Sequence, residues 1–384
     1  MRLGLIFTIL LMANVSSADT GSDHRTRIQA TDFRLSQQDG VDFTARLSLN
    51  KKRLQNSKSI SLRLPDGRFT AKRTLLTKRK HGFSWFGKIN NQSLVNLTSY
   101  KGFISGRIHT PNSLYAVVTD RHKKTWVRKV KTDQKMACVS HESHAPAGLS
   151  KTAHIDPEPP IDDVDLDLLV VYTPAALVTA GGEAQMIALM QSAVDATNQS
   201  YSGSDVSIKL NLVDVEMINY TESGHLPVDI FNNRQDGSEA VNLRNQLGAD
   251  VVSIVVNDAV FGCGFGDIQG SSGWPLGEGL APFAFNALNM ECDFGFGHLL
   301  AHELGHNQGA EHEPADTTIP PDEASFPFSY GHDWNTGVQD LGTIMADWWV
   351  PLFSNPQIYY YDPITQQSYQ LGIFGSGTII RPSI

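Results

Sequence analysis

The sequence predicts an α/β (α+β) protein in two units: a β-rich N-terminal segment and a larger unit built on a twisted mixed sheet. Two patterns indicate this division. Apolar and polar residues alternate in the first part, whereas strand-like runs alternate with helical periodicities in the second. The charge also changes sign, because residues 19–155 carry 26 Lys and Arg against 9 Asp and Glu, and residues 156–384 carry 4 against 31.

The N-terminus has the features of a secretion signal, which we predict at residues 1–18. Arg2 supplies a positive charge, residues 3–12 form a short apolar run, and residues 16–18 are small enough for signal cleavage. The apolar run is too short to span a bilayer, and no later stretch has the necessary length. We therefore expect a secreted protein without a membrane span, passing through a periplasm if the source is a Gram-negative bacterium.

Residues 19–157 form the predicted β-rich segment. Strand-like alternation occurs at 43–49, 59–64 and 114–119, with Asn, Asp and Gly between these stretches. Its basic residues are scattered rather than clustered with aromatic residues, so we do not expect nucleic-acid binding. The opposite charge of the two units predicts instead that they attract each other. Residues 145–163 lack periodicity, are rich in Pro, Ala, Ser and Asp, and are expected to form an exposed linker.

The second unit, residues 158–384, alternates strands and helices. Its apolar periodicity predicts strands at 166–172, 206–215 and 250–256, and helices over 187–201, closed by Gly203, and 240–247, closed by Gly248. This order predicts a mixed sheet with helices packed on it. Residues 262–280 are rich in glycine and are expected to form a surface loop, and residues 281–288 are expected to form an edge strand.

The segment from His302 to His312 reads HELGHNQGAEH. Four residues of α-helix turn about 400°, so His302 and His306 project from one face and can bind one cation. Glu303 then lies beside the metal, where it can act as a general base. Gly309 permits a sharp turn, after which His312 can return as a third ligand. Three neutral imidazoles with a fourth position open are typical of a catalytic zinc site (Zn2+).

His298 lies on the same predicted helix face, four residues before His302. No acidic residue follows His298 as Glu303 follows His302, so we expect His298 to lie outside the ligand set.

This motif resembles that of the metzincins, zinc peptidases in which a methionine turn follows the third histidine. Residues 342–346, GTIMA, are similar to that turn, and the resemblance implies that Met345 packs beneath the histidines without binding the metal. Further likeness to the reprolysin/adamalysin group, and within it to bacterial peptidyl-Asp metalloendopeptidases, is carried by four segments: 171–175, 198–201, 302–307 and 353–356. This sequence departs from that group in two ways: it has Glu313 where Asp is usual, and no tyrosine follows soon after Met345.

The resemblance implies a metzincin-like catalytic domain with an active-site helix and a small C-terminal subdomain. It also implies a zinc-dependent endopeptidase that hydrolyses protein or peptide substrates. We expect the substrate to lie along the predicted edge strand at 281–288, and residues 350–356 to border the pocket beyond the cleaved bond. No Lys or Arg lies between residues 245 and 380, so strict selectivity for Asp is not expected.

The chain has three cysteines. Cys263 and Cys292 both lie in the acidic unit and can form a disulfide in an oxidising compartment. Cys138 is left in the basic segment, either as an adventitious thiol or as a metal-directed one. Residues 135–139, KMACV, resemble the cysteine switch of reprolysin-type zymogens, which implies that a thiolate blocks the open zinc position. On this reading residues 19–157 are a basic inhibitory propeptide, an intramolecular inhibitor of the catalytic unit.

Two alternatives remain open at this level. A gluzincin peptidase would use a glutamate as its third ligand in place of His312. A non-enzymatic exported zinc-containing binding protein would keep the metal for structure alone, although an intact Glu303 argues against it.

Overall fold

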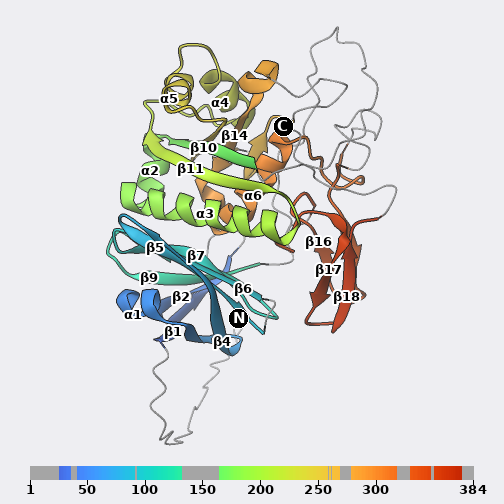
Figure 1. Cartoon of the computed structure of the whole chain (residues 1–384). Helices are drawn as coiled ribbons and strands as arrows, with labels where there is room; N and C mark the ends of the chain where they lie inside the picture. The colour runs from blue at the N-terminus through green and yellow to red at the C-terminus, as the bar shows by residue number, and fades with distance from the viewer. Residues whose placement is uncertain are drawn as a thin grey trace, which may run out of the picture.

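The computed structural model describes residues 26–35, 41–90, 93–131, 164–257, 259–260, 262–268, 278–317, 329–346 and 350–373. These residues form a β-barrel followed by an α/β unit, packed against each other (Figure 1). The predicted signal peptide, the linker, the unit boundary near residue 157 and Cys138 lie outside the described residues.

The N-terminal unit is a closed nine-stranded barrel. Its elements are β1 (Thr26–Leu35), β2 (Val41–Ser48), α1 (Lys51–Asn56), β3 (Ser59–Leu64), β4 (Gly67–Arg79), β5 (Gly82–Ile89), β6 (Ser93–Tyr100), β7 (Phe103–His109), β8 (Leu114–Thr119) and β9 (Thr125–Val130). The strands predicted at 43–49, 59–64 and 114–119 correspond to β2, β3 and β8. β1 closes the barrel by pairing antiparallel with β2 and parallel with β3. Side chains such as Trp85 and Leu97 fill the interior.

The second unit is built on a five-stranded mixed sheet. Its strands are β10 (Val164–Tyr172), β11 (Ile208–Met217), β12 (Val251–Val256), β13 (Gly264–Gly266) and β14 (Phe285–Asn289), in the order β11-β10-β12-β14-β13. All pair in parallel except β13, which is antiparallel to β14. The predicted mixed sheet and three of its strands are confirmed.

The predicted edge strand at 281–288 is wrong. β14 lies inside the sheet, between β12 and β13, and each of its five residues is buried. An edge strand and a fully buried strand can both have a short apolar run in the sequence, so periodicity could not distinguish the two. The edge is β13, which lies within the stretch expected to be an irregular loop.

The described helices of the second unit are α2 (Pro174–Ala180), α3 (Glu183–Gly203), α4 (Leu226–Asn233), α5 (Glu239–Leu247) and α6 (Phe296–Asn307), with 3-10 turns η2 (Glu278–Phe283) and η3 (Met290–Gly295). As predicted, α3 ends at Gly203 and α5 is capped by Gly248, which has a left-handed φ of 67°. Two hairpins follow: β15 (Asp333–Asn335) with β16 (Asp340–Gly342), and β17 (Asn355–Asp362) with β18 (Gln367–Leu371).

Helix α3 lies between the barrel and the sheet (Figure 1). Met186 and Met190 of α3 belong to one buried apolar cluster with Val41 and Leu114 of the barrel and Leu304 of α6. The apolar core therefore continues from the barrel into the α/β unit.

A buried carboxylate on α3 holds the barrel. Asp195 is 6% exposed and accepts hydrogen bonds from Arg79 Nη2 (2.6 Å), Ser84 Oγ (2.5 Å) and Thr98 Oγ1 (2.8 Å). These donors come from β4, β5 and β6, and together they satisfy a charge that would be costly to bury alone. At this point a positive side chain of the barrel meets the acidic unit, as the charge asymmetry predicted.

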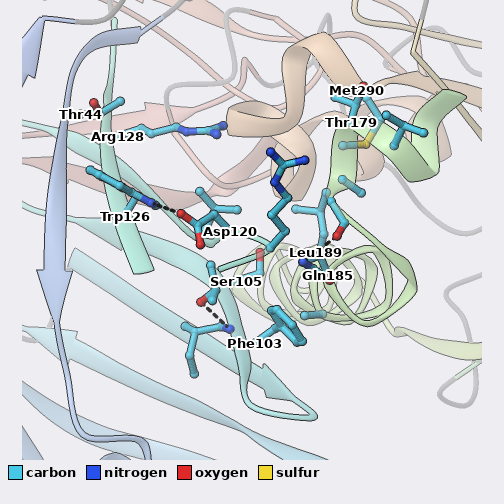
Figure 2. Close-up of a pocket in the computed structure, with 18 of the residues that line it drawn as sticks. Thr44, Phe103, Ser105, Asp120, Trp126, Arg128, Thr179, Gln185, Leu189 and Met290 are labelled. Atoms are coloured by element: carbon cyan, nitrogen blue, oxygen red, sulfur yellow. Dashed lines mark hydrogen bonds between the residues drawn. The ribbon is translucent and has the colours of Figure 1, made fainter. Parts of the chain in front are cut away.

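A cavity of about 460 Å³ lies elsewhere in the same interface, between the barrel and helices α2 and α3 (Figure 2). Asp120 points into it but accepts a hydrogen bond from the indole of Trp126, within the barrel, at 2.8 Å. The Asp195 cluster and a 3.1 Å hydrogen bond from Asn96 Nδ2 to the carbonyl of Ser192 therefore attach the barrel to α3 away from this cavity.

No helix in the described part of the chain combines the length and the apolar character needed to cross a membrane.

Candidate metal centre

Helix α6 carries the first two histidines, and a glycine turn returns the third. After Asn307 the chain bends at Gly309, whose φ of 84° is left-handed. The N–H groups of Gly309 and Ala310 donate to the carbonyls of His306 and Gly305, each at 2.9 Å, and so close the end of the helix. The predicted turn at Gly309 therefore brings His312 back towards α6.

The three imidazoles converge on one point. The Nε2 atoms lie 3.0 Å apart for His302 and His312, 3.1 Å for His306 and His302, and 3.2 Å for His306 and His312. A tetrahedral zinc ion about 2.0–2.1 Å from each nitrogen holds its ligands about 3.3 Å apart, so these residues fit the ion. Among the described His, Cys, Asp and Glu residues, this is the one group of three or more that could hold a metal.

Backbone carbonyls orient two of the rings. His302 Nδ1 donates to the carbonyl of Ile344 at 2.6 Å, and His306 Nδ1 donates to the carbonyl of Ala310 at 2.8 Å. Each ring therefore presents the lone pair of its Nε2 atom to the common point. Burial, and then the neighbouring His312 ring, lower the pKa of His302 to about 3, which keeps this ring in the neutral form that metal binding requires.

Glu303 of α6 is fully buried, and its carboxylate lies against Gly264 of the edge strand β13. It does not belong to the ligand group. His298 also stays outside that group, as predicted. It is buried one helical turn earlier, with its ring centroid 5.5 Å from that of His109 in the barrel.

Met345 packs directly beneath α6. The turn that carries it is closed by a 2.9 Å hydrogen bond from the N–H of Ala346 to the carbonyl of Thr343. Met345 is fully buried, and a Cβ added to Gly305 would overlap its sulfur. Gly305 therefore provides the space that lets the turn approach the helix, and this approach brings the Ile344 carbonyl to His302.

Cys263 and Cys292 form a disulfide, as the sequence predicted. It joins the residue before β13 to the 3-10 turn η3 that precedes α6. The edge strand is thus covalently linked to the chain entering the metal-binding helix.

Two residues with structural roles at this site were missed from the sequence. Asn307 Nδ2 donates to the carbonyls of Asp267 and Phe285, both at 2.9 Å, and Asn307 Oδ1 accepts from Asn286 Nδ2 at 2.8 Å. These bonds tie the end of α6 to β14 and to the residue after β13. Asn307 directly follows the second histidine, and its place in the motif is the only sequence signal for it. No local pattern in the sequence indicates a role for Asn286.

The comparisons with known proteins agree with this geometry. Residues 187–313, from α3 to just beyond the third histidine, match the family described as metallopeptidase family M12B, reprolysin-like. Over these residues, which include all three histidines, the chain is similar to reprolysin-like metallopeptidases.

Curated relatives carry a more specific name. The chain is 36% identical over 171 residues to the peptidyl-Asp metalloendopeptidase of Stenotrophomonas maltophilia (strain R551-3), covering 44% of this chain and 37% of that protein. It is 34% identical over 207 residues to the protein of the same name from Xanthomonas campestris pv. campestris, covering 50% and 44%. The matches therefore span less than half of each of these relatives.

Among solved structures, the chain aligns with metalloproteinase-II from Bacteroides fragilis at a TM-score of 0.40 and 13% identity, covering 66% of this chain and 81% of that one. This similarity is too low to support a fold assignment.

Proposed function

We propose that this chain is a secreted zinc-dependent endopeptidase of the metzincin type, made as a zymogen. The observation that carries the proposal is the convergence of three Nε2 atoms, 3.0–3.2 Å apart, at the helix that also carries the buried Glu303. The glycine turn before His312 and the methionine turn beneath α6 support the metzincin assignment.

His302, His306 and His312 would hold the ion. A bound zinc ion supplies a Lewis acid that polarises a carbonyl oxygen and makes a water molecule more acidic. Glu303 accepts the proton of the attacking water and then delivers a proton to the leaving amine. The roles are therefore divided between the imidazoles, which bind, and one carboxylate, which carries protons.

The edge strand β13 offers the substrate its binding edge. One side of β13 pairs with β14, and no strand of the described sheet pairs with its other side. An extended peptide can add there by backbone hydrogen bonds, next to Glu303. This replaces the expectation that residues 281–288 bind the substrate. Residues 350–356, which follow the methionine turn, remain our candidates for the pocket beyond the cleaved bond.

Strict selectivity for Asp, which the names of the relatives suggest, is not part of this proposal. Arg234 is engaged by Asp267 at 2.5 Å, Lys209 by Asp165 at 2.8 Å, and Arg244 donates to the carbonyl of Ala281 at 2.8 Å. Each of the three Lys and Arg side chains described in the second unit thus has a partner outside the metal centre. Arg381 lies outside the described residues.

We further propose that residues 19–157 act as an inhibitory propeptide. The barrel packs on α3, and the three histidines are not among the described residues that line the cavity of Figure 2. On this proposal the barrel anchors the propeptide, and blocking the metal falls to the segment that carries Cys138.

A casein digestion assay on the processed protein tests the function. We expect hydrolysis that is lost with a zinc chelator, restored by added zinc and absent from the Glu303→Ala variant. Hydrolysis that is unchanged in Glu303→Ala, or insensitive to the chelator, would overturn the proposal. A His312→Ala variant that kept zinc and activity would favour a gluzincin instead.

A further inference from the structure

We propose that Gly264 and Gly266 are positioning residues for Glu303, because the side-chain-free backbone of β13 determines where the carboxylate lies. This inference rests on the proposed function, in which Glu303 carries the proton. It assigns a role to the edge strand beyond that of pairing with substrate.

The space around the two glycines is filled by Glu303. A Cβ on Gly264 would overlap Oε1 of Glu303 and would lie 2.7 Å from its Cδ and 2.9 Å from its Cγ. Real Cβ atoms essentially never approach other heavy atoms within 3.0 Å. Neither glycine is among the residues with a positive φ, so the backbone conformation itself would admit alanine. The close approach of Glu303 is therefore what excludes a side chain at position 264.

The strand cannot easily retreat from the helix. Gly264 and Gly266 pair with Leu288 and Asn286 of β14. Cys263 is tied by its disulfide to Cys292, and its carbonyl accepts a 2.7 Å hydrogen bond from the N–H of Asn289.

The other end of β13 and the helix are also fixed. Asn307 holds the carbonyl of Asp267 at 2.9 Å, and Met345 fills the space beneath α6 at Gly305. The group that can yield to a new methyl group is the Glu303 side chain, which has rotatable bonds.

The two glycines differ in what they control. A Cβ on Gly266 would lie 2.6 Å from the backbone carbonyl oxygen of Glu303 and 3.2 Å from the Cβ of the metal ligand His306. A methyl group at 266 therefore presses on the helix backbone beside a ligand, whereas the three nearest atoms to a methyl group at 264 all belong to the Glu303 side chain. We infer that Gly264 positions the proton carrier and that Gly266 also positions the metal site.

Kinetics and metal content separate these roles. We expect processed Gly264→Ala to keep one zinc per chain and a nearly unchanged KM. Its kcat should fall about 10–100-fold, the loss expected for a displacement of roughly 1 Å in a reacting group. Gly266→Ala should in addition lose zinc to a chelator more readily. The matched control is Gly248→Ala after α5, where nothing lies within 4 Å of the new methyl group. Its left-handed φ makes alanine slightly destabilising, but kcat and zinc should be unchanged.

A double-mutant cycle in the full chain tests the contact without activity. Gly264→Ala should lower the urea midpoint of wild type but should have little effect in the Glu303→Ala background, where the obstructing carboxylate is gone. Rescue of folding by Glu303→Ala would support the contact even if Gly264→Ala alone did not fold. Equal shifts in both backgrounds, or an unchanged kcat in Gly264→Ala, would overturn the inference. A wild-type protein without peptidase activity would overturn the proposed function, while the cycle would still test the contact.

Discussion

Replacing Asp195 with alanine should destabilise the full chain by about 2–3 kcal/mol. Removing one partner of a buried ion pair costs about 3–5 kcal/mol, because the other charge stays buried without its partner. The cost should be lower here for two reasons. The Arg79 side chain is 26% exposed and can reach water, and Ser84 and Thr98 still hydrogen bond to each other at 2.9 Å.

The assay is urea unfolding of the full chain, followed by circular dichroism. The matched control is Asp165→Ala, which removes a surface partner of Lys209 whose two side chains are 65% and 66% exposed. Such a pair contributes less than about 1 kcal/mol. If Asp195→Ala and Asp165→Ala shifted the free energy of unfolding equally, the Asp195 cluster would not be what holds the barrel on α3.

Three further predictions follow from the site and the barrel. His302→Ala should lose stoichiometric zinc because it removes one of three converging nitrogens, whereas the control His298→Ala should retain it. Atomic absorption on dialysed protein measures the zinc content of both variants. Equal zinc in the two variants would contradict the ligand assignment. Burial, and then the charge of Arg107, lower the pKa of His109 to about 3. As pH falls from about 6.5 towards 3, His109 therefore takes up a proton in the unfolded chain but not in the folded one, and the folded state loses stability. His109→Gln should remove about 1–2 kcal/mol of that acid destabilisation, measured as the difference in the free energy of urea unfolding between pH 7 and pH 5. An unchanged difference in the variant would contradict this assignment. Mass spectrometry of digested casein should give a cleavage profile in which Asp does not dominate, and a profile dominated by Asp would show that a cation outside the described contacts binds the substrate.

Local periodicity explains what could be predicted from the sequence. Helix α3 and strand β10 were predicted because their apolar spacing reports the face that each buries. The triad could be predicted because a helix and a glycine turn relate its three residues within eleven positions. Met345 was found by resemblance alone, since a single buried methionine carries no local signal.

Features that depend on distant pairing could not be predicted. Closure of the barrel requires β1 to pair with both β2 and β3, and alternation within one strand does not encode its neighbours. β13 has three residues, two of them glycine, and therefore no strand signal. Its assignment as the edge follows only from its pairing with β14. The role of Asn307 likewise appears only when three separate segments come together.

The hydrogen bond from His302 to the carbonyl of Ile344 joins residues 42 positions apart. Metal affinity therefore depends on a segment that is synthesised well after the metal-binding helix. A nascent polypeptide that ends before Ile344 already contains all three histidines, yet nothing orients the first ring. Loss of such an orienting partner typically weakens metal binding 10–100-fold. If the proposed function holds, tight metal loading should therefore wait until the C-terminal segment has been made and has folded beneath the helix.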